Sequence, residues 1–237
     1  MENSSKFKEG IKAGIPVAIG YVPIAIAFGV LSKSSGIPNL VAMLMSLIIY
    51  AGASQFVGIK LMSLGISPFG IVLTTFILNL RHLLMTSYVS QKLQNDTPKE
   101  LLPLLAFGVT DETFAVASIQ KKGEIQPYFM LGLNLMAFSF WNIGTMIGLF
   151  MSSWIPEVII NSMGIALYSM FIGLIVPSMR TARPVLYVAT ASMAINSLFY
   201  FVPLLKVVSP SWGIIISTIT ASLMGSLLDA KEEQVYE

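Results

Sequence analysis

The chain has 237 residues, of which 55% are hydrophobic and 11% are charged, and its mean hydropathy is +0.77. Soluble domains contain about 25% charged residues, so this composition indicates a protein that has lipid as its solvent. The net charge of +2 is too small to favour a nucleic-acid partner. Cysteine is absent, which excludes disulfides and cysteine-ligated metals, and a single histidine, His82, argues against a multi-histidine metal site. We therefore expect neither a metal nor a cofactor.

A helix needs about 20 apolar residues to cross the hydrocarbon layer. By that criterion the sequence predicts an all-α polytopic membrane protein, a single transmembrane domain over 1–237 with about eight segments. Short polar connections with turn residues separate the segments. The predicted segments are 13–32, 40–63, 68–90, 101–119, 127–150, 157–178, 184–204 and 211–229.

The distribution of lysine and arginine predicts the orientation, because these residues accumulate on the cytoplasmic side. With eight crossings and a cytoplasmic N-terminus, nine of these residues lie inside and four outside. The four are Lys33, Lys92, Lys99 and Lys206. Both termini are therefore predicted to be cytoplasmic. The assignment fails if one segment is re-entrant, and segment four is the obvious candidate.

Weak internal similarity suggests two inverted three-helix repeats, over 10–92 and 99–180, followed by additional helices over 184–229. Pro16 and Gly20 in segment one resemble Pro103 and Gly108 in segment four. Transporters built from inverted repeats often bind substrate at the repeat interface, beside interrupted helices.

Segment one contains Gly20, Tyr21 and Pro23, with a further proline at Pro16. Proline inside a helix removes a backbone donor and clashes with the preceding turn. The sequence therefore predicts an interrupted first helix, whose freed backbone groups could bind a ligand. A kink that serves packing alone is the alternative.

Segment two carries Ala51-Gly52-Ala53-Ser54-Gln55, a run of small residues that lets a neighbouring helix approach closely. Ser54 and Gln55 are candidates for binding a ligand. A hydrogen bond between helices would explain a buried Gln55 equally well.

Segment three places Asn79 and His82 on one helical stripe, whereas Arg81 lies roughly 200° around the helix from Asn79. A buried arginine stays charged and favours a bidentate acceptor. It could instead extend to the membrane surface. His82 is either a titrating group or a hydrogen-bonded structural residue.

Asp111 and Glu112 are adjacent carboxylates near the middle of an apolar run, whereas the other ten acidic residues lie in tails, loops or segment ends. A carboxylate inside a membrane is a functional candidate by default. The alternatives are a structural ion pair or a helix end exposed to water. Adjacent helical residues point about 100° apart, so we expect one acid to pair with Arg81 and the other to exchange a proton. We assign the pair to Asp111 and the proton to Glu112, although the spacing alone does not fix this order.

Segment five supplies two secondary candidates, Asn134 and Asn142, as polar residues that could line a substrate path. The hydroxyl groups of segments seven and eight usually satisfy backbone groups in membrane helices, so we assign them no function.

Four ordered motifs resemble the azaleucine-resistance family of bacterial membrane proteins, the AzlC type. They are Gly14-x-Pro16 with Gly20-Tyr21-x-Pro23, Tyr50-Ala51-Gly52-Ala53-Ser54-Gln55-Phe56, Asn79-Leu80-Arg81-His82 and Thr110-Asp111-Glu112-x-Phe114. The resemblance covers roughly the first 120 residues, and Tyr50 stands where phenylalanine is usual. It adds Thr110 to the candidates.

The resemblance implies the large subunit of a branched-chain amino acid exporter in the bacterial cytoplasmic membrane. It also implies a small hydrophobic membrane subunit of the AzlD type as partner, an apolar amino acid as substrate and an ion gradient as driving force, with no enzymatic activity. A non-transporting scaffold or channel subunit is the alternative. An intramembrane hydrolase would need paired acids on different helices, which the sequence does not offer.

Overall fold

The computed structural model describes residues 2–118, 124–156, 158–159, 165, 169, 172–173, 175–176, 179–180, 183–202 and 210–236. In these ranges the chain is helical and forms no strand. The elements are α1 (Glu2–Ser34), α2 (Asn39–Leu44), the π-helical turn η1 (Met45–Ile49), α3 (Gly52–Ser63), α4 (Pro68–Lys92), the 3-10 turn η2 (Lys99–Leu101), α5 (Leu102–Phe107), α6 (Asp111–Ser118), α7 (Pro127–Met151), α9 (Arg183–Phe201) and α10 (Pro210–Tyr236).

The helices belong to two compact units, Met1–Ser63 with Leu78–Ala166, and Leu64–Ile77 with Leu167–Glu237. Among the described residues, four helices are long and apolar enough to cross a membrane, namely α1, α4, α7 and α9, and α10 has a shorter apolar stretch. Most of predicted segment six lies outside the described residues. The first unit contains every residue of the candidate site, so it is described in detail.

The predicted interruption of the first helix is wrong, because α1 continues from Glu2 to Ser34 with Pro16 and Pro23 inside it. Both prolines are exposed. The proline rings, and the carbonyl groups whose backbone hydrogen bonds the prolines remove, therefore do not disturb the packed face of α1. That face packs along α7 and supports the helix throughout.

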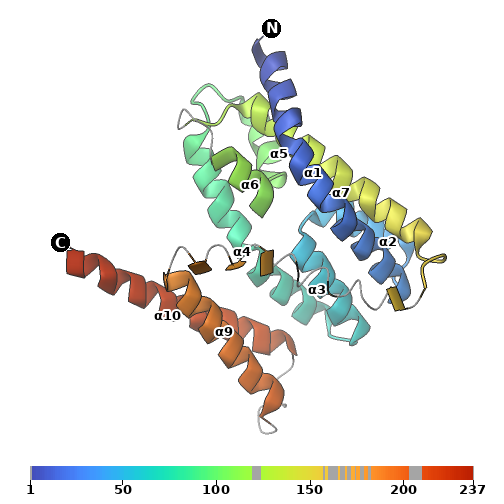
Figure 1. The fold of residues 1–237 in the computed structure, drawn as a ribbon, viewed down its shortest axis with the longest axis vertical. Helices are drawn as coiled ribbons and strands as arrows, with labels where there is room; N and C mark the ends of the chain where they lie inside the picture. Colours follow the sequence, from blue (N-terminus) through green and yellow to red (C-terminus); the bar gives the residue numbers. More distant parts are fainter. Residues whose placement is uncertain are drawn as a thin grey trace. The chain divides into compact units, whose positions relative to one another are not determined.

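Glycines bring α1 and α7 into close contact, and Figure 1 shows the two helices side by side. A Cβ atom on Gly10 would meet the backbone of Phe129, and one on Gly29 would meet the backbone of Thr145. Near the end of α1, the Nζ of Lys33 donates to the carbonyl of Leu149 at 3.1 Å. Residues later in α1 contact residues later in α7, so the two helices run parallel.

Predicted segment two is a hairpin of two short helical pieces. The chain breaks at Tyr50, whose φ of 43° is left-handed, and α3 begins at Gly52. Before the break, Ser46 bonds to Thr145 at 2.9 Å, and after it the ring of Phe56 packs on Phe28 at 5.6 Å. A Cβ on Gly58 would lie 3.5 Å from the methyl group of Met45, so the two pieces fold back on each other.

Predicted segment four is a second hairpin, broken between Gly108 and Thr110. Leu105 before the break and Ala117 after it share one buried cluster with Val89, Ile125 and Phe129. The ring of Phe114 packs on Tyr88 at 5.4 Å. The chain therefore enters along α5 and returns along α6. Neither predicted segment, 40–63 or 101–119, is one continuous helix. That segment four is re-entrant in the membrane stays a prediction.

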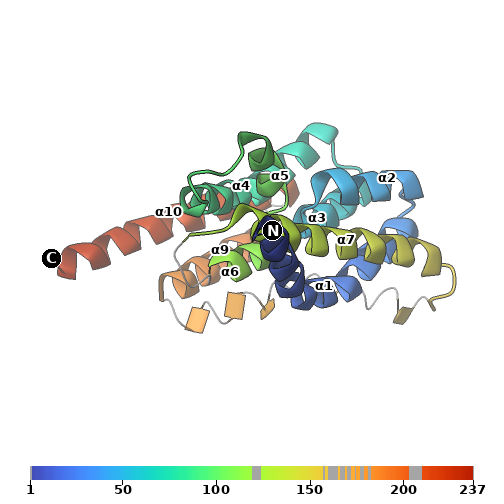
Figure 2. The same ribbon diagram turned by 90° about the horizontal axis from the view of Figure 1, so that it is seen from above.

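The part of α4 that belongs to the first unit, from Leu78 on, runs antiparallel to α1 and α7. Leu93, just after its C-terminus, pairs with Ile125, just before the N-terminus of α7. The hairpin of α5 and α6 thus begins and ends at the N-terminal end of α1, and the hairpin of α2 and α3 at the opposite end. Their tips meet where the ring of Tyr50 packs on Phe107 at 5.9 Å. Figure 2 gives a second view of these elements.

Three lysines lie at other ends of the first unit than a chain with eight crossings would give them. Lys92 is the last residue of α4 and Lys99 the first of η2, so both lie at the same end as the N-terminus of α1. Lys60 lies near the C-terminus of α3, at the same end of the first unit as Lys33 near the C-terminus of α1. The difference arises because a hairpin returns to the end from which it started, whereas a single crossing does not. The Lys121-Lys122 loop and Lys206 are outside the described residues.

Candidate functional site

The N-terminus of α6 is defined by a reciprocal pair of threonines. The backbone N–H of Thr110 donates to Oγ1 of Thr113 at 2.8 Å, and the N–H of Thr113 donates to Oγ1 of Thr110 at 3.3 Å. This is the geometry of a capping box, with threonine in place of the usual glutamate or glutamine. It begins a helix at Asp111, so that both carboxylates lie in the first turn, where the helix dipole favours negative charge.

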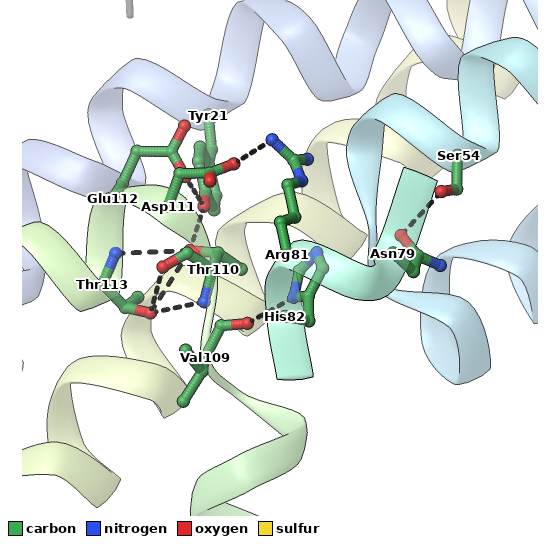
Figure 3. A network of polar contacts seen from close by, with 10 residues as sticks. All are labelled: Tyr21, Ser54, Asn79, Arg81, His82, Val109, Thr110, Asp111, Glu112 and Thr113. Carbon is green, nitrogen blue, oxygen red and sulfur yellow. Dashed lines mark hydrogen bonds and ion pairs between the residues drawn. The ribbon is translucent and has the colours of Figure 1, made fainter. Parts of the chain in front are cut away.

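Asp111 forms the predicted ion pair with Arg81. Its Oδ2 lies 2.6 Å from Nη1 of Arg81, and the side chains are 24% and 31% exposed. Arg81 extends from α4 toward the tip of the second hairpin, as Figure 3 shows. Because the guanidinium is engaged by a carboxylate of the chain itself, it serves first to hold that tip against α4.

Glu112 points to a different partner, Tyr21 of α1. The hydroxyl of Tyr21 lies 2.5 Å from Oε2 of Glu112 and 2.6 Å from Oγ1 of Thr110. A phenol has one proton, so when Tyr21 donates to the carboxylate, Thr110 must donate to Tyr21. The two adjacent acids therefore have different surroundings, as their helical spacing predicts.

Two further side chains hold the second hairpin. Nδ1 of His82 lies 2.9 Å from the carbonyl of Val109 and, because a carbonyl only accepts, this nitrogen carries the proton. Nδ2 of Asn134 donates to the carbonyl of Leu105 at 3.0 Å, and the same asparagine occupies the space beside Gly108. These bonds satisfy carbonyl groups that the broken helix leaves free. They favour the structural interpretation of His82 and Asn134.

The tip of the first hairpin is held in a similar way. Ser54 donates from Oγ to Oδ1 of Asn79 at 2.7 Å, so α4 contacts both tips through different faces (Figure 3). Nε1 of Trp141 donates to Oε1 of Gln55 at 3.1 Å. Gln55 is fully buried, and its Nε2 has no hydrogen-bond partner among the residues that the structure describes. Within the same residues the hydroxyl of Tyr50, which is 3% exposed, has none either.

Aromatic rings surround the meeting point of the tips. Tyr21 packs edge-on against Trp141 at 5.3 Å, and Trp141 lies over Phe28 at 6.5 Å. On the other side, Tyr50 packs edge-on against Phe138 at 4.9 Å. The polar groups are therefore embedded in apolar surroundings, where hydrogen bonds and charges act more strongly than in water.

The structure thus brings together most of the residues that the sequence singled out. They are Ser54, Gln55, Asn79, Arg81, His82, Thr110, Asp111, Glu112, Tyr21 and Asn134. Gly20 and Pro23 are exposed on α1 and do not join them. Asn142 donates to the carbonyl of Phe138 in its own helix.

Sequence reasoning missed the parts played by Tyr50 and Thr113. The pattern Thr-x-x-Thr at 110–113 could have indicated a helix start. Nothing in the sequence pattern indicates that Tyr50 adopts a left-handed conformation, because tertiary packing imposes it.

The arrangement is suited to binding a small charged group or a proton. Glu112 is partly exposed and has hydroxyl donors beside it. In the described part of the chain, no three acidic, histidine or cysteine side chains come together as a metal site would need.

Comparison with known proteins agrees with this picture. The family model described as AzlC protein matches residues 16–155. An uncharacterized membrane protein of Archaeoglobus fulgidus is 34% identical over 76% of this chain and 79% of its own length. The inner membrane protein YgaZ of Escherichia coli is 32% identical over 75% of each chain. The branched-chain amino acid transport protein AzlC of Bacillus subtilis is 26% identical over 63% of this chain and 59% of its own length. No solved structure matches. The matched region contains both hairpins and the polar cluster at their tips, and the chain belongs to the AzlC protein family.

Proposed function

We propose that this protein exports branched-chain or similar apolar amino acids across the cytoplasmic membrane. In this proposal it is the large subunit of a two-component secondary transporter that is driven by a proton gradient. The observation that carries the proposal is the polar cluster where two broken helices meet inside an apolar bundle. Half-helix ends at mid-membrane supply the partial charges that bind zwitterionic substrates in other transporters. The name of the Bacillus subtilis relative supports the substrate class.

In this proposal the two acids have separate roles. Asp111 and Arg81 neutralise each other and hold the hairpin of α5 and α6 against α4. Glu112 is the coupling group, because its hydrogen bond is to the neutral hydroxyl of Tyr21, whereas Asp111 forms an ion pair with Arg81. A carboxylate that binds either a proton or the ammonium group of the substrate exchanges one for the other.

Transport in proteoliposomes tests the proposal. Vesicles loaded with radiolabelled L-leucine would contain the purified chain, with or without a co-expressed small hydrophobic membrane subunit. We expect efflux above that of empty vesicles only with both subunits, and faster efflux when the receiving side is acidic. The absence of efflux for leucine, isoleucine, valine and methionine under all conditions would contradict the proposal.

The variant Glu112→Gln tests the coupling step. At saturating leucine we expect it to exchange leucine across the membrane without responding to a pH gradient. Glu100→Gln is the matched control, because Glu100 is exposed in η2, and it should behave like the wild type. If Glu112→Gln retains a normal response to the gradient, another group carries the proton.

A further inference from the structure

The two hairpin tips are built alike, although the sequence shows little similarity between them. Asn79 lies 58 positions after Tyr21, and Glu112 lies 58 positions after Ser54. Tyr21 of α1 bonds to Glu112 of the second tip, and Asn79 of α4 bonds to Ser54 of the first tip. Each long helix thus holds the tip of the other hairpin through an equivalent position. Because α1 and α4 are antiparallel, the two halves are inverted relative to each other.

The equivalent tips differ in charge. The first turn of α6 contains Asp111 and Glu112, whereas the equivalent positions in α3 are Ala53 and Ser54, and its first turn has no acidic residue. The first-turn N–H groups of a helix have no acceptor within the helix and favour an anion. The chain therefore supplies carboxylates to one of its two half-helix N-termini and none to the other.

Gln55, in the first turn of α3, carries a hydrogen-bond donor that has no acceptor among the described residues. The indole of Trp141 only donates, so it fixes the amide oxygen of Gln55 toward itself. The Nε2 of Gln55, in a side chain with no exposed surface, has no acceptor in the described part of the chain. The same indole ring contacts Gly52, the first residue of α3. A buried donor without a partner costs about 1–3 kcal/mol, which an incoming acceptor would recover.

The proposal rests on the proposed function and names how the substrate is held. We propose that the carboxylate of the transported amino acid binds at the N-terminus of α3. It accepts hydrogen bonds from Nε2 of Gln55 and from the first-turn amides, while the ammonium group faces Glu112 of the other tip. The substrate thus takes the place at α3 that Asp111 and Glu112 take at α6.

Substrate analogues separate the two charged groups of the ligand. L-leucine has both, and L-leucinamide keeps the ammonium group but lacks the carboxylate. Binding of each would be measured by calorimetry on the purified protein with its small subunit. The informative variant is Gln55→Glu, which has the same shape and keeps an acceptor for Trp141 but replaces the donor with a negative charge. We expect leucine affinity to fall at least about tenfold, the cost of losing a hydrogen bond to a charged group, and leucinamide affinity to be maintained.

A second variant and a control distinguish a loss of carboxylate binding from a loss of folding. Gln55→Met removes the donor without adding charge and should weaken leucine binding while leaving leucinamide binding unchanged. Gln91→Glu makes the same chemical change at an exposed position of α4 and should leave both affinities unchanged. If both Gln55 variants bind leucine like the wild type, or lose both ligands equally, the carboxylate does not bind there. If the wild-type complex binds no apolar amino acid, the proposed function fails first, and this site fails with it.

Discussion

Asp111 begins the returning half of a broken helix, and Arg81 of α4 meets its carboxylate at 2.6 Å. The pair therefore joins a hairpin tip to a long helix, and its loss should affect the position of the tip as well as the local charge. Removing one member of a buried pair leaves the other charge uncompensated, which costs more than removing both.

We expect Arg81→Gln and Asp111→Asn each to lower the stability of the purified protein, and the double variant to recover part of the loss. Fully buried pairs lose about 3–5 kcal/mol when one partner is removed. Partial exposure should reduce the loss here to about 2 kcal/mol. Thermal melting in detergent measures it. The exposed pair of Lys6 and Glu9, at 3.0 Å, provides the control, and Glu9→Gln should have little effect. Additive losses in the double variant would mean that the pair is not coupled.

If both hairpins enter and leave the membrane on one side, the sidedness of three positions differs from that expected for eight crossings. Single cysteines at Ser35, Lys60 and Asn95 can be labelled without background, because the chain has no cysteine. All three positions are exposed. We expect Ser35→Cys and Lys60→Cys to react from one side of the membrane and Asn95→Cys from the other. With eight crossings, Ser35 and Asn95 would share a side and Lys60 would be opposite, so an impermeant reagent on intact cells decides between the two.

The contact between α1 and α7 predicts a contrast between two glycines. Gly148→Val should destabilise the protein, because a Cβ there would collide with the backbone of Ile26. Overpacking of this kind costs about 1–3 kcal/mol. Gly20→Val should have little effect on packing, since nothing lies within 4 Å of the Cβ position. Comparison of melting temperatures checks both, and equal losses would show that α1 and α7 do not pack in this way.

The threonine pair at the start of α6 should contribute to stability and to the position of Glu112. Thr113→Val removes the acceptor for the N–H of Thr110 while keeping the shape of the side chain. We expect a loss of about 1 kcal/mol, typical of a helix cap. Thr113→Ser keeps the hydroxyl and should restore most of it. A Thr113→Val protein as stable as the wild type would show that the cap contributes nothing.

Much of the fold and the site follows from local sequence. Long apolar runs predict α1, α4 and α7 because length and hydropathy are properties of the segment itself. The pairing of Arg81 with Asp111 follows from the cost of an unpaired charge in an apolar medium. The hairpins do not follow, because the 40–63 run is apolar enough for a continuous helix. Only packing against α1 and α7 shows that the chain reverses at Tyr50. The prediction of an interrupted α1 from Pro16 and Pro23 was wrong for the opposite reason. Packing against α7 stabilises a continuous α1, although the prolines of α1 disfavour a helix.

The parallel contact between α1 and α7 has a consequence for biosynthesis. Helix α7 emerges from the ribosome only after both hairpins have been made. Until then the face of α1 that contains the glycines cannot contact α7. Contacts between distant parts of a chain form slowly for this reason. The hairpins, which cannot remain in lipid with their broken backbones exposed, would complete their enclosure only when α7 closes against α1. Truncated chains that end before Pro127 lack α7, so their hairpins are not enclosed. We expect proteases to degrade these chains faster than chains that include α7.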